Sequence, residues 1–260
     1  MSEMRENNTV KAARLKKQPL EEGEMALINA QSLKELESGE VYAFKIAACD
    51  TKVDRDKERF SEASLAKLAA LYVGRPVLMD HCWSASKQVA RVYAGEVEQD
   101  GDCKRLVLRA YMPNTEDNKA LIDAIDSGVI REVSVGCSVS KRSCSVCGKE
   151  YKHGWAPDCA HVPGKSYDGA LCHTVLDAVT DAYELSFVAV PAQPEAGVIR
   201  KTYGASNEGW VEKVAEAVAA RLQLADPTPP ETPLVSDPAP DPDGTALIKS
   251  SRTLLETINY

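Results

Sequence analysis

The chain has 260 residues, enough for one large domain or two small ones with a sizeable buried core. Its composition, 44% hydrophobic and 27% charged, is that of an ordinary soluble globular protein, and its formal net charge of −8 argues against nucleic-acid binding through a general positive field. No apolar run approaches the roughly 20 residues of a membrane span, and the polar N-terminus lacks an apolar signal core, so we expect a protein that is cytosolic where it is made.

After a polar arm at residues 1–38, which we expect to be mobile or helical, the pattern alternates short strands with a few helices. Ser61 precedes leucines at helical spacing and is placed to cap that helix, and the Asp-Gly pair at 100–101 is a turn signal between two strands. In chain order, the sequence predicts a strand at 41–48, a helix at 61–72, a strand at 76–79, a hairpin of 88–97 and 104–111, a helix capped by Asn114 or Thr115 and ending at Gly128, and strands at 132–139 and 183–190.

Many short strands with two or three helices predict an α+β fold with a mostly antiparallel, β-barrel-like core and a few flanking helices. We place this compact domain at residues 39–204. An amphipathic helix is predicted at 205–225, because apolar residues recur on one side of it. Residues 226–260 are predicted to be a disordered Pro-rich linker, at 226–243, followed by a terminal peptide.

The most specific local pattern is Cys144-Ser-Val-Cys147-Gly148, followed by Cys159-Ala-His161. Two cysteines with two residues between them reach one tetrahedral ion, the glycine permits the tight turn, and a second pair completes the shell. Three thiolates and one imidazole leave no position for a water molecule. We therefore predict a structural zinc knuckle, inserted at about 142–173. His161 is preferred as the fourth ligand over three alternatives: His153, Cys172 and His173.

Four further stretches carry weaker signals whose order and spacing form a pattern. They read Asp54-Arg-Asp-Lys-Glu-Arg-Phe60, Gly74-Arg-Pro-Val-Leu-Met-Asp-His81, Arg131-Glu-Val-Ser-Val-Gly136 and Tyr183-Glu-Leu-Ser-Phe-Val-Ala-Val-Pro-Ala192, the last continuing through Pro194 and Ala196. Over roughly residues 40–200, this pattern resembles the phage prohead proteases, the serine proteases of capsid maturation. It is similar, more distantly, to the herpesvirus assemblins, whose barrel carries a serine with two histidines.

The residues themselves fit peptide hydrolysis by acyl transfer, which needs a nucleophile, a base and a group that orients the base. Ser134 is the candidate nucleophile, on the polar side of an apolar strand where Gly136 lets a substrate approach closely. His81 is the candidate base, because the other three histidines lie in or beside the zinc loop. Glu184 is chosen as the orienting carboxylate, a departure from the assemblins. The alternatives are Asp181, Asp177 and Asp80.

The oxyanion donors are not located by the sequence, although Arg131 and a turn after Val139 are candidates. We expect the zinc knuckle to be inserted near the active site. Two other functions compete with the peptidase. One is a non-enzymatic capsid scaffold with a structural zinc site, which has no need of the Ser134/His81 pair. The other is a zinc-dependent nucleic-acid module, which the acidic total charge disfavours.

The resemblance also implies a setting. Copies of the chain would lie inside a procapsid in the host cytoplasm, cleave the phage scaffold and/or major capsid protein, and cut themselves. We expect self-cleavage in the linker at 226–243 or near Ala205, because extended chain enters a protease cleft most easily. The assemblins suggest a homodimer. Neither a membrane nor a nucleic acid is an expected partner.

Overall fold

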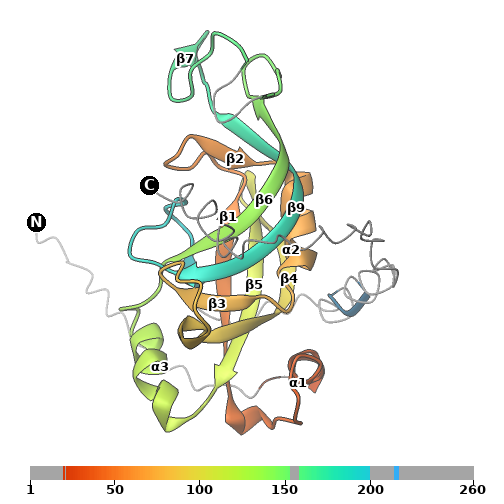
Figure 1. Ribbon diagram of the computed structural model, residues 1–260, viewed down its shortest axis with the longest axis vertical. Helices are drawn as coiled ribbons and strands as arrows, with labels where there is room; N and C mark the ends of the chain where they lie inside the picture. The colour runs from red at the N-terminus through yellow and green to blue at the C-terminus, as the bar shows by residue number, and fades with distance from the viewer. Residues whose placement is uncertain (1–19, 21, 153–157, 200–213, 217–260) are drawn as a thin grey trace, which may run out of the picture. The chain divides into compact units, whose positions relative to one another are not determined.

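The computed structural model describes residues 20, 22–152, 158–199 and 214–216 (Figure 1). The chain divides into two units, residues 1–224 and 225–260, and the second lies wholly outside the described residues. The predicted linker, the terminal peptide and the expected self-cleavage sites therefore also lie outside them. No helix of the described part is long and apolar enough to cross a membrane.

The core is one mixed sheet whose strands pair in the order β10-β1-β5-β4-β3-β9-β2, with β6 on the other edge of β9. Only β2 and β3 run parallel to β9, and every other pairing is antiparallel. The strands are β1 Val41–Asp50, β2 Glu58–Phe60, β3 Pro76–Met79, β4 Ala90–Asp100, β5 Cys103–Pro113, β6 Val133–Cys144, β9 Thr174–Phe187 and β10 Gly197–Ile199.

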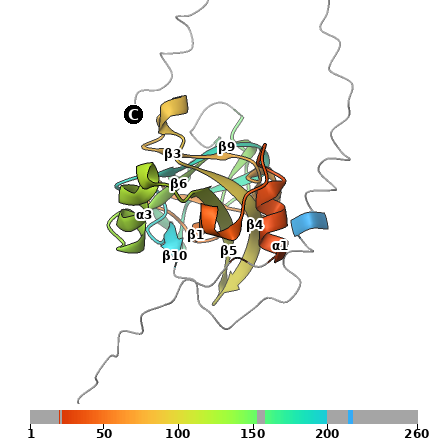
Figure 2. The ribbon, with the colours of Figure 1, turned by 90° about the horizontal axis from the view of Figure 1, so that it is seen from below.

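Few helices accompany this sheet. They are α1 Glu22–Asn29, α2 Glu62–Leu71 and α3 Lys119–Asp126, with short 3-10 turns η1 Ser38–Glu40, η2 Ala85–Lys87 and η3 Glu116–Asn118. Figure 2 shows α1 and α3 on opposite sides of the strands. A separate hairpin of β7 Ser166–Tyr167 and β8 Ala170–Leu171 stands at the far end of β6 and β9 (Figure 1). The predicted α+β class, mostly antiparallel with few helices, is confirmed.

The predicted barrel is not closed. The far edge of the sheet, β10, meets the start of β6 through a single bridge between Glu132 and Gly197. Two hydrogen bonds support it: the amide of Val198 donates to the carbonyl of Arg131 (2.8 Å), and the amide of Val133 donates to that of Ala196 (3.3 Å). The sheet thus curls until its two ends touch, but no ladder joins β6 to β10 and no closed barrel forms among the described residues.

Helix α2 fixes the strands that will carry the candidate site. Its N-cap is Ser61, as predicted, whose hydroxyl accepts from the amide of Ser64. Leu65 and Leu68 are fully buried against the sheet, and burying each stabilises the fold by about 1.5–3 kcal/mol. Tyr72 follows the helix, and its buried hydroxyl donates to backbone carbonyls of both β6 and β9, at Gly136 (3.1 Å) and Glu184 (3.2 Å).

The N-terminal arm, predicted to be mobile or helical, contains the helix α1, and this helix is packed against the sheet. Ile28 of α1 is fully buried in a second apolar cluster with Tyr93 of β4, and the hydroxyl of Tyr93 donates to the carboxylate of Glu24 (2.9 Å). Of the helix predicted at 205–225, the structure describes 214–216 as helical, with Val214 buried in the same cluster.

Two strands extend beyond their predicted limits. β6 continues to Cys144 instead of turning after Val139, and β9 begins at Thr174 instead of Tyr183. β9 carries two β-bulges, at Tyr183 and Thr180, where the β6–β9 register shifts. Each shift breaks the alternation of apolar and polar residues on which the prediction depended. Of the two predicted caps, Thr115 is the N-cap residue of η3, which leads directly into α3, but its side chain makes no capping hydrogen bond.

Candidate active site and metal centre

Three neighbouring strands bring the predicted site residues together (Figure 1). His81 follows β3, Glu184 lies on β9 and Ser134 lies on β6. Ser186 of β9 stands between them, since it pairs with Leu78 of β3 on one side and with Ser134 on the other. Residues directly opposite in a ladder project to the same face of the sheet. Ser134 and Ser186 therefore share one face.

The imidazole and the carboxylate form the strongest contact of this face. Nδ1 of His81 lies 2.7 Å from Oε1 of Glu184. The carboxylate is only 4% exposed, whereas the imidazole is 42% exposed and borders solvent. Ser186 is fully buried; its hydroxyl donates to the other oxygen, Oε2 of Glu184 (2.6 Å), and accepts from the backbone amide of His81 (3.1 Å). Each carboxylate oxygen thus has a partner.

The turn that carries His81 is strained. Asp80 and His81 have φ angles of 54° and 52°, in the left-handed region that side chains with a Cβ rarely adopt. The turn is held because the amide of Asp80 donates to the carbonyl of Phe187 (2.9 Å) and that of Cys82 to Met79 (3.0 Å). Such strain costs on the order of 1–3 kcal/mol per residue and is typical of functional sites. Here it turns the imidazole back toward Glu184.

The same contacts set the charge of the imidazole. The hydrogen bond to Glu184 raises the pKa of His81 above its ordinary value, partial burial opposes this, and the charges of Glu184 and Asp80 add to the rise. The site therefore stabilises an imidazolium, which is the form that a general base takes after it accepts a proton.

Ser134 lies on the same face as Glu184 but is not hydrogen-bonded to His81. Among the described residues, neither its Oγ nor Nε2 of His81 has a hydrogen-bond partner. The shared face follows from Gly136, which stands two residues along β6 and opposite Glu184. A Cβ at Gly136 would overlap Oε1 of Glu184. The glycine thus admits the carboxylate, a role that the sequence pattern did not predict.

Gly136→Ala is expected to displace the Glu184 carboxylate and lower the pKa of His81 toward about 6.5, because the bond between them is the main cause of its rise. An NMR titration of the imidazole measures this directly. Gly39→Ala is the matched control, since a Cβ there has no neighbour within 4 Å. An unchanged His81 pKa in Gly136→Ala would contradict the assigned role of the glycine.

The other candidate carboxylates are engaged elsewhere. Asp181 accepts from Nη2 of Arg75 (2.7 Å), and Asp177 accepts from the hydroxyl of Ser61 (2.7 Å). Asp80 acts on His81 only through its charge. Of the candidate oxyanion donors, the guanidinium of Arg131 pairs with its neighbour Glu132 (3.2 Å), and the turn expected after Val139 is absent because β6 continues.

Two exposed aromatic rings border the site. Trp83 follows His81 by two residues and Tyr183 precedes Glu184, and their ring centroids are 5.7 Å apart. Tyr183 is the extra residue of a bulge, because Gly136 pairs with Glu184 while Cys137 pairs with Ala182. The bulge turns this ring outward, where it can contact an apolar group of a bound molecule.

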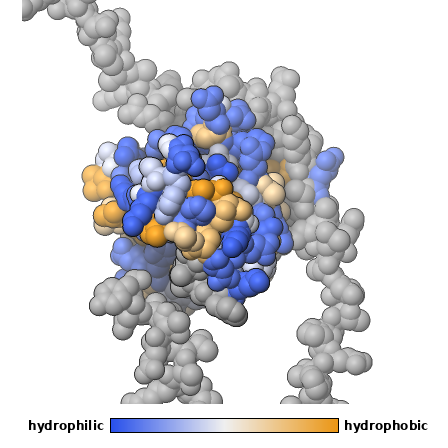
Figure 3. Space-filling view, turned by 90° about the horizontal axis from the view of Figure 1, so that it is seen from above, coloured by the Kyte–Doolittle hydropathy of each residue, from blue (hydrophilic) through white to orange (hydrophobic). Residues whose placement is uncertain are grey.

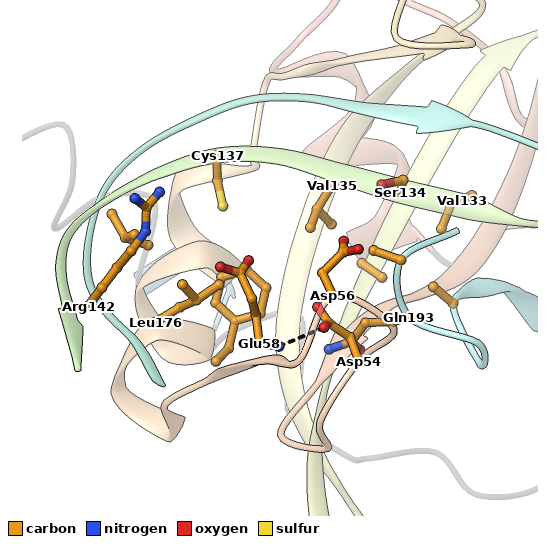
Figure 4. Close-up of a pocket in the computed structure, with 15 residues that line it drawn as sticks. Asp54, Asp56, Glu58, Val133, Ser134, Val135, Cys137, Arg142, Leu176 and Gln193 are labelled. Carbon is orange, nitrogen blue, oxygen red and sulfur yellow. Dashed lines mark hydrogen bonds between the residues drawn. The ribbon is translucent and has the colours of Figure 1, made fainter. Parts of the chain in front are cut away.

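A cavity of about 270 Å³ is lined by β6, with Ser134 among its lining residues, and extends over the face of β6 that carries Val135 and Cys137 (Figure 4). Val135 and Cys137 point into it from β6, and Asp54, Asp56 and Glu58 line it from the loop and strand below. Burial raises the pKa of both Asp54 and Glu58. Its described lining residues do not include His81 or Glu184, so the cavity is separate from the His81–Glu184 pair.

The predicted metal ligands form a cluster at the far end of β6. The ligand atoms of Cys144, Cys147, Cys159 and His161 all lie within 4.8 Å of one another. Gly148 makes the predicted turn, with a φ of 70° and an amide that donates to the carbonyl of Cys144 (2.8 Å). Three sulfurs and one nitrogen suit a tetrahedral ion, so the cluster is compatible with zinc.

The surroundings of His161 and Cys144 indicate whether these residues fit a metal. Nδ1 of His161 is buried and has no hydrogen-bond partner among the described residues, as a ligand nitrogen would without its ion. Tyr167 of β7 packs its ring edge-on against the imidazole, with centroids 4.6 Å apart. Burial opposes ionisation of the Cys144 thiol, but backbone amides of Cys147 and Val146 outweigh it and lower its pKa to about 6.

The alternative ligands divide into three cases. Cys172 is fully buried with its sulfur 3.9 Å from that of Cys144, so it borders the cluster. His173 directs Nδ1 to the carbonyl of Leu171 (3.0 Å) instead. His153 lies outside the described residues.

The metal cluster is distant from the candidate active site, which corrects the expected proximity. Ser134 and Cys144 stand near opposite ends of β6, a strand of 12 residues, so roughly 30 Å separates them. Figure 3 looks onto the end that carries β7 and shows largely hydrophilic side chains, with apolar groups between them. No described residue from 145 to 171 is buried, so this lobe lacks an apolar core of its own.

Removing the metal is expected to unfold this lobe and to lower the melting temperature, because a segment without an apolar core depends on its ion. Calorimetry of the zinc-loaded protein with and without a chelator measures the effect. Cys147→Ser should reproduce it, whereas Cys82→Ser, which removes an exposed thiol outside the cluster, should not. An identical melting temperature with and without bound zinc would contradict the structural role.

A scan of the chain against protein-family models finds no match, and a search of curated proteins also finds none.

Proposed function

We propose that the chain is a serine endopeptidase of viral procapsid maturation. Ser134 would be its nucleophile, His81 its base and Glu184 the carboxylate that orients the base. One observation carries the proposal: a buried carboxylate holds Nδ1 of an exposed imidazole at 2.7 Å, on the sheet face that also carries Ser134.

The reaction would follow from this arrangement. Oγ of Ser134 attacks the scissile carbonyl carbon while Nε2 of His81 takes the hydroxyl proton, and Glu184 stabilises the imidazolium through Nδ1. The imidazolium then gives its proton to the leaving amine. Water, activated by the same nitrogen, hydrolyses the acyl-enzyme and restores Ser134. Hydrogen bonds of this kind are often long before substrate binds, so Ser134 and His81 need to meet only in the substrate complex.

The alternative is a non-enzymatic capsid scaffold or assembly protein with a structural zinc site. It is favoured by the lack of a hydrogen bond between Ser134 and His81. It gives no account, however, of the buried carboxylate or of two consecutive left-handed residues, since both cost stability and neither is needed to complete the sheet. We therefore prefer the peptidase.

The setting rests on the resemblance to phage prohead proteases. The substrates would be the scaffold and/or major capsid protein, together with the chain itself, inside the procapsid in the host cytoplasm. A homodimer is proposed from the likeness to assemblins. Zinc held by Cys144, Cys147, Cys159 and His161 would stabilise the lobe, far from the reacting atoms.

Covalent labelling tests the proposal without knowledge of the cleavage sequence. A fluorophosphonate is expected to phosphonylate Ser134: its phosphorus bonds to Oγ, fluoride leaves and His81 takes the hydroxyl proton. Peptide mass mapping locates the adduct, and His81→Ala should abolish it. Labelling of a different serine, or none at a saturating dose, would overturn the proposal.

A further inference from the structure

Ser186 is a buried side chain that hydrogen-bonds to both members of the His81–Glu184 pair, and the sequence pattern assigned it no role. It is fully buried and lies between β3 and β6 on β9. Its hydroxyl is 2.6 Å from Oε2 of Glu184 and 3.1 Å from the backbone nitrogen of His81.

The chemistry of these partners fixes every proton in the network. A backbone amide only donates, so the hydroxyl oxygen of Ser186 must accept from His81. The single hydroxyl proton is then given to Oε2 of Glu184. With Glu184 ionised, Oε1 accepts as well, so Nδ1 of His81 carries the proton. In the neutral imidazole, Nε2 is then left with its lone pair.

We propose that Ser186 is a positioning residue that sets the tautomer and orientation of His81, a role that rests on the proposed peptidase function. The hydroxyl holds the carboxylate from one side and the strained backbone of His81 from the other. It thereby places a basic Nε2 toward the face that carries Ser134. Ser186 itself is not the nucleophile, because it is buried and its proton is committed to Glu184.

Ser186→Ala is expected to lower kcat by about 10- to 100-fold with little change in KM, since it misplaces the base and leaves substrate contacts intact. The pKa of His81 should fall toward about 6.5, which moves the acid limb of the rate profile to lower pH. Ser186→Thr, which keeps the hydroxyl, should restore both values in large part. Ser138→Ala is the matched control, because that hydroxyl bonds only Thr180 (2.6 Å) on the same strand pair.

The measurements separate this inference from the proposed function. NMR titration of His81 in the full chain reports its pKa without any activity, whereas fluorophosphonate labelling reports the nucleophile. If Ser186→Ala loses stability but keeps the His81 pKa and the rate profile, the residue is merely structural and the inference is overturned. If wild type is neither labelled nor active, the peptidase proposal fails, even where the His81 pKa falls as expected. If Ser186→Ala does not fold, Ser186→Thr is compared with wild type. A His81 pKa and a rate that match those of wild type support the role. Loss of the His81 pKa shift, although the hydroxyl is retained, contradicts it.

Discussion

Replacing Ser134 with alanine is expected to lower kcat by about 10⁵- to 10⁶-fold. The substitution removes the atom that would form the acyl-enzyme, and the hydroxyl opposite it, that of Ser186, is buried and bonded to Glu184. The measurement is co-expression with a capsid and scaffold substrate, read by intact mass. Wild type should yield fragments, and the variant should leave all chains at full length.

Stability should be unaffected by the same change. Ser134 makes no side-chain hydrogen bond among the described residues, so Ser134→Ala should keep the melting temperature and the zinc content of wild type. Ser138→Ala, which changes a serine further along β6, should cleave normally. A Ser134→Ala protein that still cuts, with the fragments of wild type, would remove this serine from the reaction.

Local chemistry explains which parts could be predicted from the sequence. The Ser61 cap, the Asp-Gly hairpin and the Cys144–Cys147 turn each depend on residues within a few positions of one another. The pairing of His81 with Glu184 is predicted by a different argument, which does not depend on neighbouring residues. The other three histidines lie in or beside the zinc loop, which leaves His81, and Glu184 lies on the strand that is expected to close the barrel.

The remaining parts depend on contacts between segments far apart in the chain. The bulges that shift the register of β6 against β9 have no local signature, and they decide that Tyr183 faces outward. Ser186 reads as an ordinary strand serine until β3 is placed beside it. The burial of Ile28 likewise requires β4 as its partner. A single sequence shows periodicity within one element, but it does not show which faces of different elements meet.

The candidate active site and the cluster of candidate metal ligands lie at opposite ends of the same pair of strands, β6 and β9. The β6–β9 ladder runs from the Ser134–Ser186 pair to the Cys144–Thr174 pair, so the proposed metal would anchor one end while the candidate site occupies the other. Loss of the metal should fray this ladder from the lobe inward. Labelling of Ser134 would therefore outlast the unfolding of the lobe, and the proposed base and nucleophile would not depend on the ion itself.

Glu184→Gln is expected to lower kcat by about 10⁴-fold while the site keeps its shape. The amide is nearly isosteric with the carboxylate, but its NH₂ group would donate to Nδ1 of His81. The proton would then reside on Nε2, which could no longer accept one from Ser134. The pKa of His81 should also fall, because the bond to the carboxylate is the main cause of its rise. Kinetics across pH, with an NMR titration of His81, measure both effects.

The stability of this variant should depend on pH in a defined direction. Because the folded pKa of His81 is raised, the charged pair stabilises wild type fully below the unfolded value of about 6.5, and this contribution is lost as pH rises through the folded value. The melting temperatures of wild type and Glu184→Gln should therefore converge at alkaline pH. Asp181→Asn is the control, since Asp181 lies on β9 like Glu184 but pairs with Arg75, so its loss should leave the His81 pKa unchanged. If Glu184→Gln kept both the His81 pKa and the rate of wild type, the carboxylate would be a buried structural group and His81 would lack its orienting partner.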